Sequence, residues 1–258
     1  MTIDAVAAPL AGRAMLVTGA SSGIGRAIAL AAARAGADVA LTYRVNRQGA
    51  EDVEREITAL GRRAAVLRLD LADTESLGAL GPAAREALGH LDVWVNNAGA
   101  DILTGAGAKL SPTQKIDTVL GVDLRGTMLA SWQAAEMFAA QDGGGVIINM
   151  SWDHVTFGMQ GLNPQIYGAA KGGVLAFSKC LARSVAPRVR VNILAPGWIE
   201  TSFGAGADER LRRTVAESTP LKRWGTPEDV AGAAVFLASP AAAFLTGQTI
   251  MVGGGIVM

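Results

Sequence analysis

Tyr167 and Lys171 stand four residues apart in a segment, residues 164–185, whose composition and length are typical of a helix. Side chains at this spacing lie on the same face of a helix. A tyrosine phenol has a reference pKa of about 10, and moving it to about 7 requires roughly 4 kcal/mol of phenolate stabilisation. An ammonium group about 5 Å away supplies roughly 3 kcal/mol at an effective dielectric constant of about 20. The pair therefore predicts a tyrosine that exchanges a proton with a substrate, assisted by the lysine.

A glycine-rich segment, residues 18–25 (TGASSGIG), lies between an apolar run and an alanine-rich helical segment. A loop between a strand and a helix is the context of a dinucleotide-binding turn. In such a turn Gly19 allows the tight bend, Gly23 allows the backbone to approach a pyrophosphate, and Gly25 allows close packing of helix and strand. The helix amino terminus offers free N–H groups and the positive end of its dipole to the phosphates. We predict cofactor contacts from Gly19, Ser21, Ser22, Gly23, Ile24 and Gly25.

Short apolar runs alternate with longer helical segments along the chain. Strands are predicted at residues 14–18, 39–43, 64–69, 91–95, 146–150, 189–193 and 249–252, and helices at 23–35, 49–60, 74–88, 112–140, 164–185 and from Pro227. This alternation predicts parallel strands joined by right-handed crossovers, and the apolar strands indicate that helices cover both faces of the sheet. We expect an α/β fold, a doubly wound Rossmann-type sheet of about seven strands. We expect residues 1–258 to form one domain, with residues 1–12 as an N-terminal extension.

Further motifs follow the glycine-rich loop in a fixed order. Residues 96–99 (NNAG) come after the fourth predicted strand, Tyr167 and Lys171 form a YxxxK pattern, and Pro196-Gly197 comes after the sixth strand. Together with the TGxxxGxG loop, these motifs resemble those of the short-chain dehydrogenase/reductase family over nearly the whole chain. The resemblance implies hydride transfer between NAD(P)(H) and a carbonyl or secondary alcohol. Tyr167 would be the general acid/base, and Lys171 would also hold the nicotinamide ribose.

The resemblance implies further roles outside these motifs. Residues 201–218 are expected to close over the substrate as a lid, the kind of segment that often gates turnover. Family members are often tetramers, so we expect a homo-oligomer, either a tetramer or a dimer. The resemblance implies that Asp70 contacts the cofactor. The alternative is that its carboxylate caps the segment that follows it. The implied cofactor contacts beyond the glycine-rich loop are Asp70, Leu71, Asn97, Ala98, Gly99, Tyr167, Lys171, Pro196, Gly197, Ile199 and Thr201.

The end of the second predicted strand indicates which dinucleotide binds. It has no acidic residue of the kind that holds the ribose hydroxyls of NAD. Arg44 stands there instead, and a guanidinium group suits the 2′-phosphate of NADP. We therefore expect NADP(H) to be preferred, with NAD(H) as the alternative. The other interpretation is that Arg44 and Arg47 are solvated loop charges.

The end of the fifth predicted strand departs from the family's pattern. Family members usually carry two small residues there, the second being the serine that polarises the substrate carbonyl, and Trp152 stands at that second position. Ser151 comes one residue earlier, where an extended chain points the side chain the other way. His154 precedes Tyr167 by thirteen residues, the spacing of the serine in many relatives, and a neutral imidazole donates hydrogen bonds. Three possibilities stay open for the carbonyl donor: Ser151, His154, or no donor at all. We expect Trp152, Asp153 and His154 to line the substrate pocket.

Asp123 is a second departure, because many relatives have asparagine there in a water relay to the lysine. An aspartate would stabilise Lys171 as an ion and would partly offset the effect of that lysine on the pKa of Tyr167. The two departures motivate an alternative function, a non-catalytic NADP(H)-binding sensor or partner subunit. Gly253 stands where many relatives have aspartate, a change that the sequence does not explain.

Composition limits the remaining classes of function. The 258 residues include 23 basic and 23 acidic side chains and carry no net charge, so the basic excess of a nucleic-acid-binding protein is absent. The apolar runs are too short for a membrane span, and the start has no signal-peptide pattern, so we expect a cytoplasmic protein without membrane partners. Cys180, the only cysteine, is expected to pack as a buried apolar residue. No metal site is predicted, and the expected partner is a small carbonyl or alcohol substrate.

Overall fold

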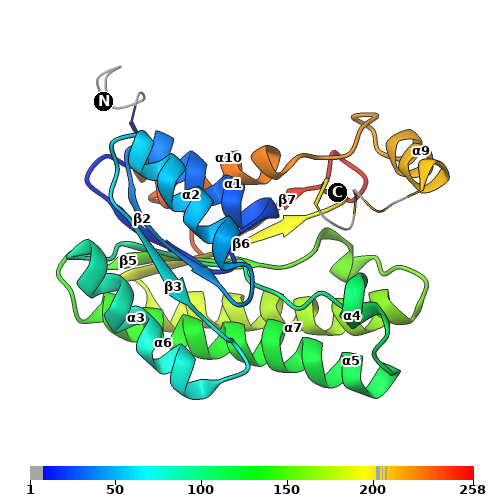
Figure 1. The fold of residues 1–258 in the computed structure, drawn as a ribbon, viewed down its shortest axis with the longest axis horizontal. Coiled ribbons are helices and arrows are strands. Elements are labelled where there is room, and N and C mark those ends of the chain that lie inside the picture. Colours follow the sequence, from blue (N-terminus) through cyan, green and yellow to red (C-terminus); the bar gives the residue numbers. More distant parts are fainter. Residues whose placement is uncertain (1–7, 202–203, 205, 207) are drawn as a thin grey trace.

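The computed structural model describes residues 8–201, 204, 206 and 208–258, and within them a parallel sheet lies between two layers of helices (Figure 1). The order of the seven strands in this sheet is β3-β2-β1-β4-β5-β6-β7. The predicted doubly wound α/β fold is therefore confirmed. The strands are β1 (Ala14–Val17), β2 (Asp38–Tyr43), β3 (Ala64–Arg68), β4 (Val93–Asn96), β5 (Gly145–Met150), β6 (Val189–Pro196) and β7 (Thr249–Val252).

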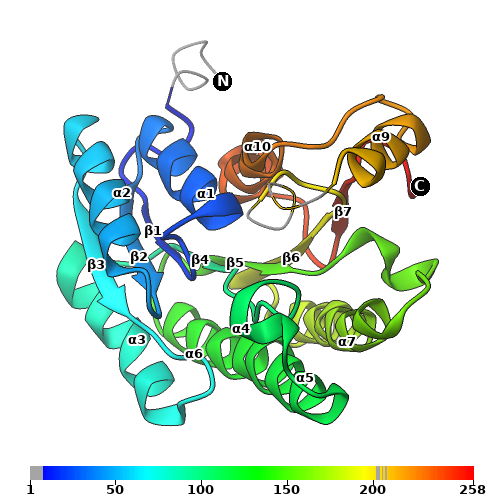
Figure 2. The ribbon, with the colours of Figure 1, turned by 45° about the vertical axis from the view of Figure 1, so that its right-hand side comes forward.

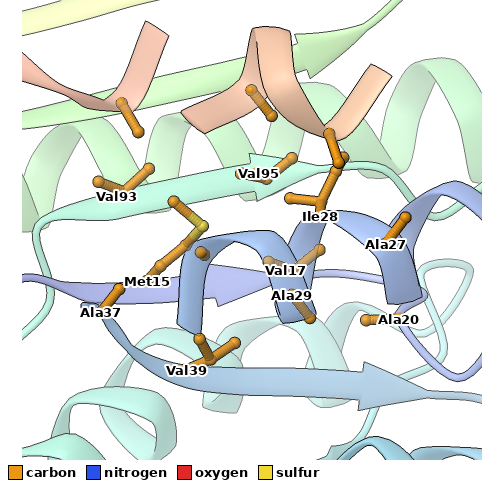
Figure 3. Close-up of a cluster of buried hydrophobic side chains, with 14 of the residues drawn as sticks. Met15, Val17, Ala20, Ala27, Ile28, Ala29, Ala37, Val39, Val93 and Val95 are labelled. Carbon is orange, nitrogen blue, oxygen red and sulfur yellow. The ribbon is translucent and has the colours of Figure 1, made fainter. Parts of the chain in front are cut away.

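Helices cover both faces of the sheet, as the apolar strands require (Figures 1 and 2). One layer contains α1 (Gly23–Arg34), α2 (Arg47–Ala59) and α10 (Pro227–Ala238), and the other contains α3 (Thr74–Leu88), α6 (Thr127–Ala139) and α7 (Leu162–Val185). Figure 3 shows the first layer, where Ile28 and the small alanines of α1 lie against Met15, Val17 and Val95 of the sheet. The alanines allow the helix to pack close to the strands, and this places the start of α1 at the carboxyl end of β1.

The sheet reverses its order between β1 and β4, because the chain crosses from one half of the sheet to the other. Ligands bind to doubly wound sheets at this point, beside the carboxyl ends of the strands. The glycine-rich loop, the NNAG motif and the end of β5 all lie at this edge. The structure thus brings together residues that are far apart in the sequence.

The predicted helix at residues 112–140 is interrupted. It consists of α5 (Pro112–Val119), a π-helical turn η2 (Leu120–Gly126) and α6. Single π turns within helices occur frequently at functional sites, and this turn carries Asp123. Three short elements of the described residues were not predicted: α4 (Gly105–Ala108) and the 3-10 turns η3 (Asp153–Thr156) and η4 (Pro240–Ala242).

Some expectations concern segments at the margins of the described structure. Residues 1–7 of the expected N-terminal extension, and residues 202–203, 205 and 207 of the expected lid, lie outside the described residues. The rest of the lid includes α9 (Glu209–Ser218), which stands apart from the two helix layers in Figures 1 and 2. Cys180 is exposed on α7, so the expectation that it is buried was wrong. The helix turns Ser178 and Leu181 inward instead.

Two absences hold for the described part of the chain. None of its helices combines the length and the apolar character needed to cross a membrane. Its histidine, cysteine, aspartate and glutamate side chains form no group of three that could hold a metal ion.

Candidate active site

The glycine-rich loop forms a cradle of backbone atoms at the carboxyl end of β1. Gly19 has a φ of +66°, and a Cβ atom there would lie 2.8 Å from the Cα atom of Ala98. The Gly19 N–H donates to Thr42 Oγ1 at 3.0 Å. A Cβ atom at Gly25 would overlap the Gly19 carbonyl oxygen. Only glycine fits these two positions, and the resulting close turn is the shape that a pyrophosphate requires.

Asn97 holds the loop in place from the neighbouring strand. Its side-chain amide donates to the carbonyl oxygens of Thr18 at 2.9 Å and Gly19 at 3.2 Å. The Thr18 hydroxyl in turn accepts hydrogen bonds from the backbone N–H groups of Asn97 and Ala98, both at 3.0 Å. Thr18 and Thr42 were missed in the sequence reasoning, although Thr18 opens the TGxxxGxG motif.

The amino terminus of α1 is available to an anion. Ser22 is the N-cap residue and its side chain makes no capping hydrogen bond. The free N–H groups of the first turn therefore have no side-chain partner at this position. Ser21 and Ile24 flank Ser22 and Gly23 in the same turn, and the Ser21 carbonyl oxygen accepts a hydrogen bond from Asn46 at 3.4 Å.

The other predicted cofactor residues lie around the same edge. The Thr201 methyl carbon is 3.7 Å from the Cβ position of Gly23, so the segment after Pro196 and Gly197 reaches the glycine-rich loop. Ile199 is buried and bridges to Gly225. Leu71 is buried beside Gly126, and Gly99 lies against the carboxylate of Asp123.

Asp70 does not cap a helix. Its carboxylate accepts a hydrogen bond from the backbone N–H of Ala72 at 3.0 Å, within the turn that follows β3. Asp73 is the N-cap residue of α3 and accepts from Glu75. The capping alternative for Asp70 was therefore wrong, and a cofactor contact stays a prediction.

Arg44 and Arg47 differ in their partners. Arg47 Nε lies 2.7 Å from Glu51 Oε1, one turn further along α2. Arg44 is exposed after β2, and within the described residues its guanidinium group has no hydrogen bond or ion pair. Of these two arginines, Arg44 is the one whose guanidinium group is unpaired within the described residues.

Lys171 is buried between three groups. Its ammonium nitrogen lies 5.4 Å from the centre of the Tyr167 ring and 3.1 Å from Asp123 Oδ2, and it donates to the Met150 carbonyl oxygen at 3.2 Å. The Lys171 and Asp123 side chains are 4% and 1% exposed, so this is a buried ion pair. The predicted pairing of Tyr167 and Lys171 on one face of α7 is present in the structure.

Asp123 is held in place by its surroundings. Its Oδ1 atom accepts the backbone N–H of Ala100 at 2.8 Å. A Cβ atom at Gly99 would lie 2.8 Å from Oδ2, so the glycine of the NNAG motif makes room for the carboxylate. The π turn and the NNAG motif together direct the carboxylate at Lys171.

The charges around Tyr167 act in opposite directions. Burial raises the pKa of Tyr167, the Lys171 charge lowers it, and the Asp123 charge raises it again, so the pKa stands above the ordinary value of a phenol. Burial lowers the pKa of Lys171, but Tyr167 and Asp123 raise it, and the pKa ends above its ordinary value. In the protein alone, the Lys171 charge therefore does not lower the pKa of Tyr167 below its ordinary value. Tyr167 is therefore a neutral phenol in the protein alone.

Ser151 and Trp152 point in different directions after β5. The Ser151 hydroxyl is buried and donates to the Lys171 carbonyl oxygen at 2.9 Å, so it is occupied within the protein. This placement does not favour Ser151 as a donor to a substrate. Trp152 meets the Tyr167 ring edge-on, with 5.5 Å between ring centres, and its six-membered ring lies against Gly168 of α7.

Asp153 and His154 form a pair on η3. His154 Nδ1 lies 2.5 Å from Asp153 Oδ1, the Asp153 side chain is fully buried, and the His154 ring stacks on Trp152. A Cβ atom at either Gly197 or Gly253 would overlap Asp153 Oδ2. This explains the glycine at position 253, because the carboxylate of Asp153 occupies the space that a side chain there would need.

Comparisons with known proteins agree with this geometry. Residues 19–257 match the family model described as enoyl-(acyl carrier protein) reductase. The chain belongs to the short-chain dehydrogenase/reductase family. It is 37% identical to L-rhamnose 1-dehydrogenase (NAD(P)(+)) of a Sphingomonas species, over 96% of this chain and 97% of that protein.

Solved structures of the family have the same fold. A short-chain dehydrogenase/reductase of Serratia marcescens has a TM-score of 0.87 and 31% identity, over 97% of this chain and all of that chain. A 7α-hydroxysteroid dehydrogenase in complex with NADH and 7-oxo glycochenodeoxycholic acid has a TM-score of 0.88 and 30% identity, over 100% of this chain and 98% of that chain. This chain is accordingly an NAD(P)-dependent oxidoreductase that acts on CH–OH or C=O groups.

Proposed function

We propose that the protein is an NADP(H)-preferring carbonyl reductase in which Tyr167 donates the proton to the substrate oxygen. Bound NADPH would supply the hydride. The chain's own residues would orient the substrate, exclude water and hold the proton on Tyr167 Oη until the transfer. Lys171 would stabilise the phenolate that remains, and Asp123 would keep Lys171 charged.

The observation that carries this proposal is the buried ion pair beside the phenol. A buried ion pair is often no more stabilising than apolar residues of similar size. Perturbed titratable groups that converge in this way are typical of a catalytic site. The neutral phenol is the form that would give its proton to a carbonyl oxygen in the reduction, and the same group would take the proton back in the reverse oxidation.

Arg44 supports the preference for NADP(H). It is exposed at the end of β2 and lacks a partner among the described residues, and a guanidinium fork binds phosphate oxygens in pairs. The backbone cradle around Gly19 and Gly25 fits the pyrophosphate of the same cofactor. The lid, the cytoplasmic location and the homo-oligomeric state stay predictions.

Two measurements test the proposal. NADPH and NADH affinities, measured by nucleotide fluorescence, should differ in favour of NADPH. NADPH absorbance should then fall with at least one member of a panel of ketosteroids, ketoacyl thioesters, oxidised sugars and small ketones. Tight NADPH binding without turnover of any carbonyl would favour a cofactor-binding sensor or partner subunit instead.

A further inference from the structure

Lys115 is a buried lysine without an acidic partner. It lies on α5 with 7% of its surface exposed, and its ammonium nitrogen donates to Asn163 Oδ1 at 3.0 Å. Within the described residues no carboxylate pairs with it. A buried charge is costly unless it is paired, and the amide oxygen takes only one of the three N–H groups of the ammonium. Two N–H groups of Lys115 therefore remain for a ligand.

The start of α7 adds further donors at the same place. Gly161 is the N-cap residue of this 24-residue helix, and the first turn has neither a capping side chain nor an acidic residue. The backbone N–H groups of Leu162 and Asn163 have no partner in the part of the chain that the structure describes. These groups form the positive end of the helix dipole, and Lys115 places a second positive charge beside it. Donors and positive charge thus gather here without an acidic side chain to balance them.

Two polar contacts join α5 and η2 to α7, and Tyr167 lies between them along the helix. One is the Lys115–Asn163 contact at 3.0 Å, and the other is the Asp123–Lys171 ion pair at 3.1 Å. Asn163, Tyr167 and Lys171 follow one another on α7 at four-residue spacing, so they lie on one face of the helix. Four residues span about 6 Å along a helix axis. The Lys115 ammonium is therefore bound one turn of α7 from the reacting phenol, on the side opposite to Lys171.

Large apolar side chains are exposed around this end of α7. They are Leu103, Phe157, Met159 and Leu162. The last three lead into the helix, and Leu103 follows Ile102, which shares an apolar cluster with Ile166 of α7. Exposed apolar side chains that gather beside a few convergent polar groups are typical of a ligand-binding surface. The surroundings of Lys115 thus suit a ligand with an apolar body and one anionic group.

We propose that Lys115 and Asn163 bind a carboxylate of the substrate, so that the enzyme reduces an apolar oxo acid. This inference rests on the reductase function proposed above and names its substrate class. One ammonium group balances the single charge of a carboxylate, and the free N–H groups of Lys115, of the Asn163 side chain and of the start of α7 are its donors. The substrate carbonyl then lies at Tyr167, about one helical turn from the carboxylate. The carboxylate positions the substrate and takes no part in the chemical step.

The first test measures the binding of hexanoate to the NADPH complex by calorimetry and needs no turnover. The wild type should bind hexanoate, and Lys115→Met should weaken this binding by about tenfold or more, the usual effect of losing a charge-assisted contact. Asn163→Asp gives Lys115 a carboxylate of the chain itself, so it should also prevent hexanoate binding. The matched control is Lys109→Met, at an exposed lysine at the end of α4, which should bind hexanoate as the wild type does.

Stability distinguishes a binding site from a purely structural contact. Lys115→Met removes a buried charge and keeps an apolar side chain of similar length, so without hexanoate its urea midpoint should equal or exceed that of the wild type. Asn163→Asp should raise the midpoint, because it pairs Lys115 and places a negative charge at the start of α7. A lower midpoint of Lys115→Met, together with unchanged hexanoate affinity of Asn163→Asp, would show that the contact only holds the two helices together and would overturn the proposal.

The second test compares oxo fatty acids with their methyl esters as substrates, in a series that varies the number of carbon atoms between carbonyl and carboxylate. At the best chain length, kcat/KM of the wild type should favour the acid over the ester by about tenfold or more. In Lys115→Met this preference should fall to about one, mainly through KM, because the contact is the same in the ground state and the transition state. Binding of inorganic phosphate that depends on Lys115, with equal reduction of acid and ester, would identify a site for a free anion and refute the substrate assignment.

The two proposals fail in different ways. If no carbonyl is reduced while hexanoate binding depends on Lys115, the reductase function is wrong and the carboxylate site stands. If carbonyls are reduced but hexanoate does not bind, or binds equally well to the wild type, Lys115→Met and Asn163→Asp, the reductase function stands and the carboxylate site is refuted.

Discussion

Replacing Lys171 with methionine should destabilise the fold by leaving Asp123 buried without its counterion. At the observed separation of 3.1 Å, the attraction of two unit charges is about 5 kcal/mol at an effective dielectric constant of about 20. Removing one partner of a buried pair typically costs about 3–5 kcal/mol, because the remaining charge keeps its desolvation penalty. The two estimates agree, so we expect Lys171→Met to lose about 3–5 kcal/mol of unfolding free energy at pH 8.

Urea unfolding followed by circular dichroism measures this loss at fixed protein concentration. With a urea dependence of about 3 kcal/mol per molar, the midpoint should fall by about 1 M or more. The deficit should shrink at pH 5, because the carboxyl group that has lost its counterion takes up a proton more readily in the folded than in the unfolded chain.

Two further variants make the result specific. Lys171→Met combined with Asp123→Asn removes both charges and keeps the acceptor for the Ala100 N–H, so it should recover most of the lost stability. Lys179→Met, at an exposed position of the same helix, should change stability by no more than about 0.5 kcal/mol. Equal instability of the single and double variants, or a deficit that does not change with pH, would refute the reasoning.

Other predictions concern the cofactor site and the phenol. Arg44→Ala should weaken NADPH binding by at least tenfold, because a charge-assisted contact is worth about 1.5–3 kcal/mol. It should leave NADH binding largely unchanged, and fluorescence titration measures both. Arg47→Ala is the control, since that side chain is already paired within α2. Gly25→Ala should cost about 1–3 kcal/mol of stability and abolish NADPH binding, because the added methyl group would displace the glycine-rich loop. Its control is Gly78→Ala, at an open helical position, which should stabilise the fold by about 0.5–1 kcal/mol. Burial and the Asp123 charge raise the pKa of Tyr167 while Lys171 lowers it, so Asp123→Asn should move the alkaline loss of reductase activity to lower pH; a pH–rate profile that does not move would contradict this.

The elements could be predicted because their signals are local. The alternation of apolar runs and helices gives the strands within a few residues, and α3 and β7 begin and end where predicted. The glycine-rich loop and the NNAG motif carry their own conformational requirements, such as the positive φ of Gly19. The π turn at Asp123 was not predicted, because it inserts into a continuous helical pattern without glycine or proline at its centre.

The substrate side of the site could not be predicted in the same way. The direction of Ser151 depends on the path of the chain after β5, where η3 intervenes. The glycine at position 253 makes sense only beside Asp153, a residue one hundred positions earlier. Burial raises the pKa of Tyr167 and so opposes the effect of the Lys171 charge, the only one of the two effects that the YxxxK spacing predicts. These are tertiary effects, and no short pattern in the sequence encodes them.

The most direct test of the central claim is the rate of NADPH oxidation by Tyr167→Phe with the best carbonyl of the panel. The comparison is with Tyr43→Phe, which removes the only other phenol of the chain. If Tyr167 is the proton donor, Tyr167→Phe lowers turnover by at least about 10²-fold while NADPH affinity and Tyr43→Phe turnover stay at the wild-type level. Wild-type turnover by Tyr167→Phe would contradict the account.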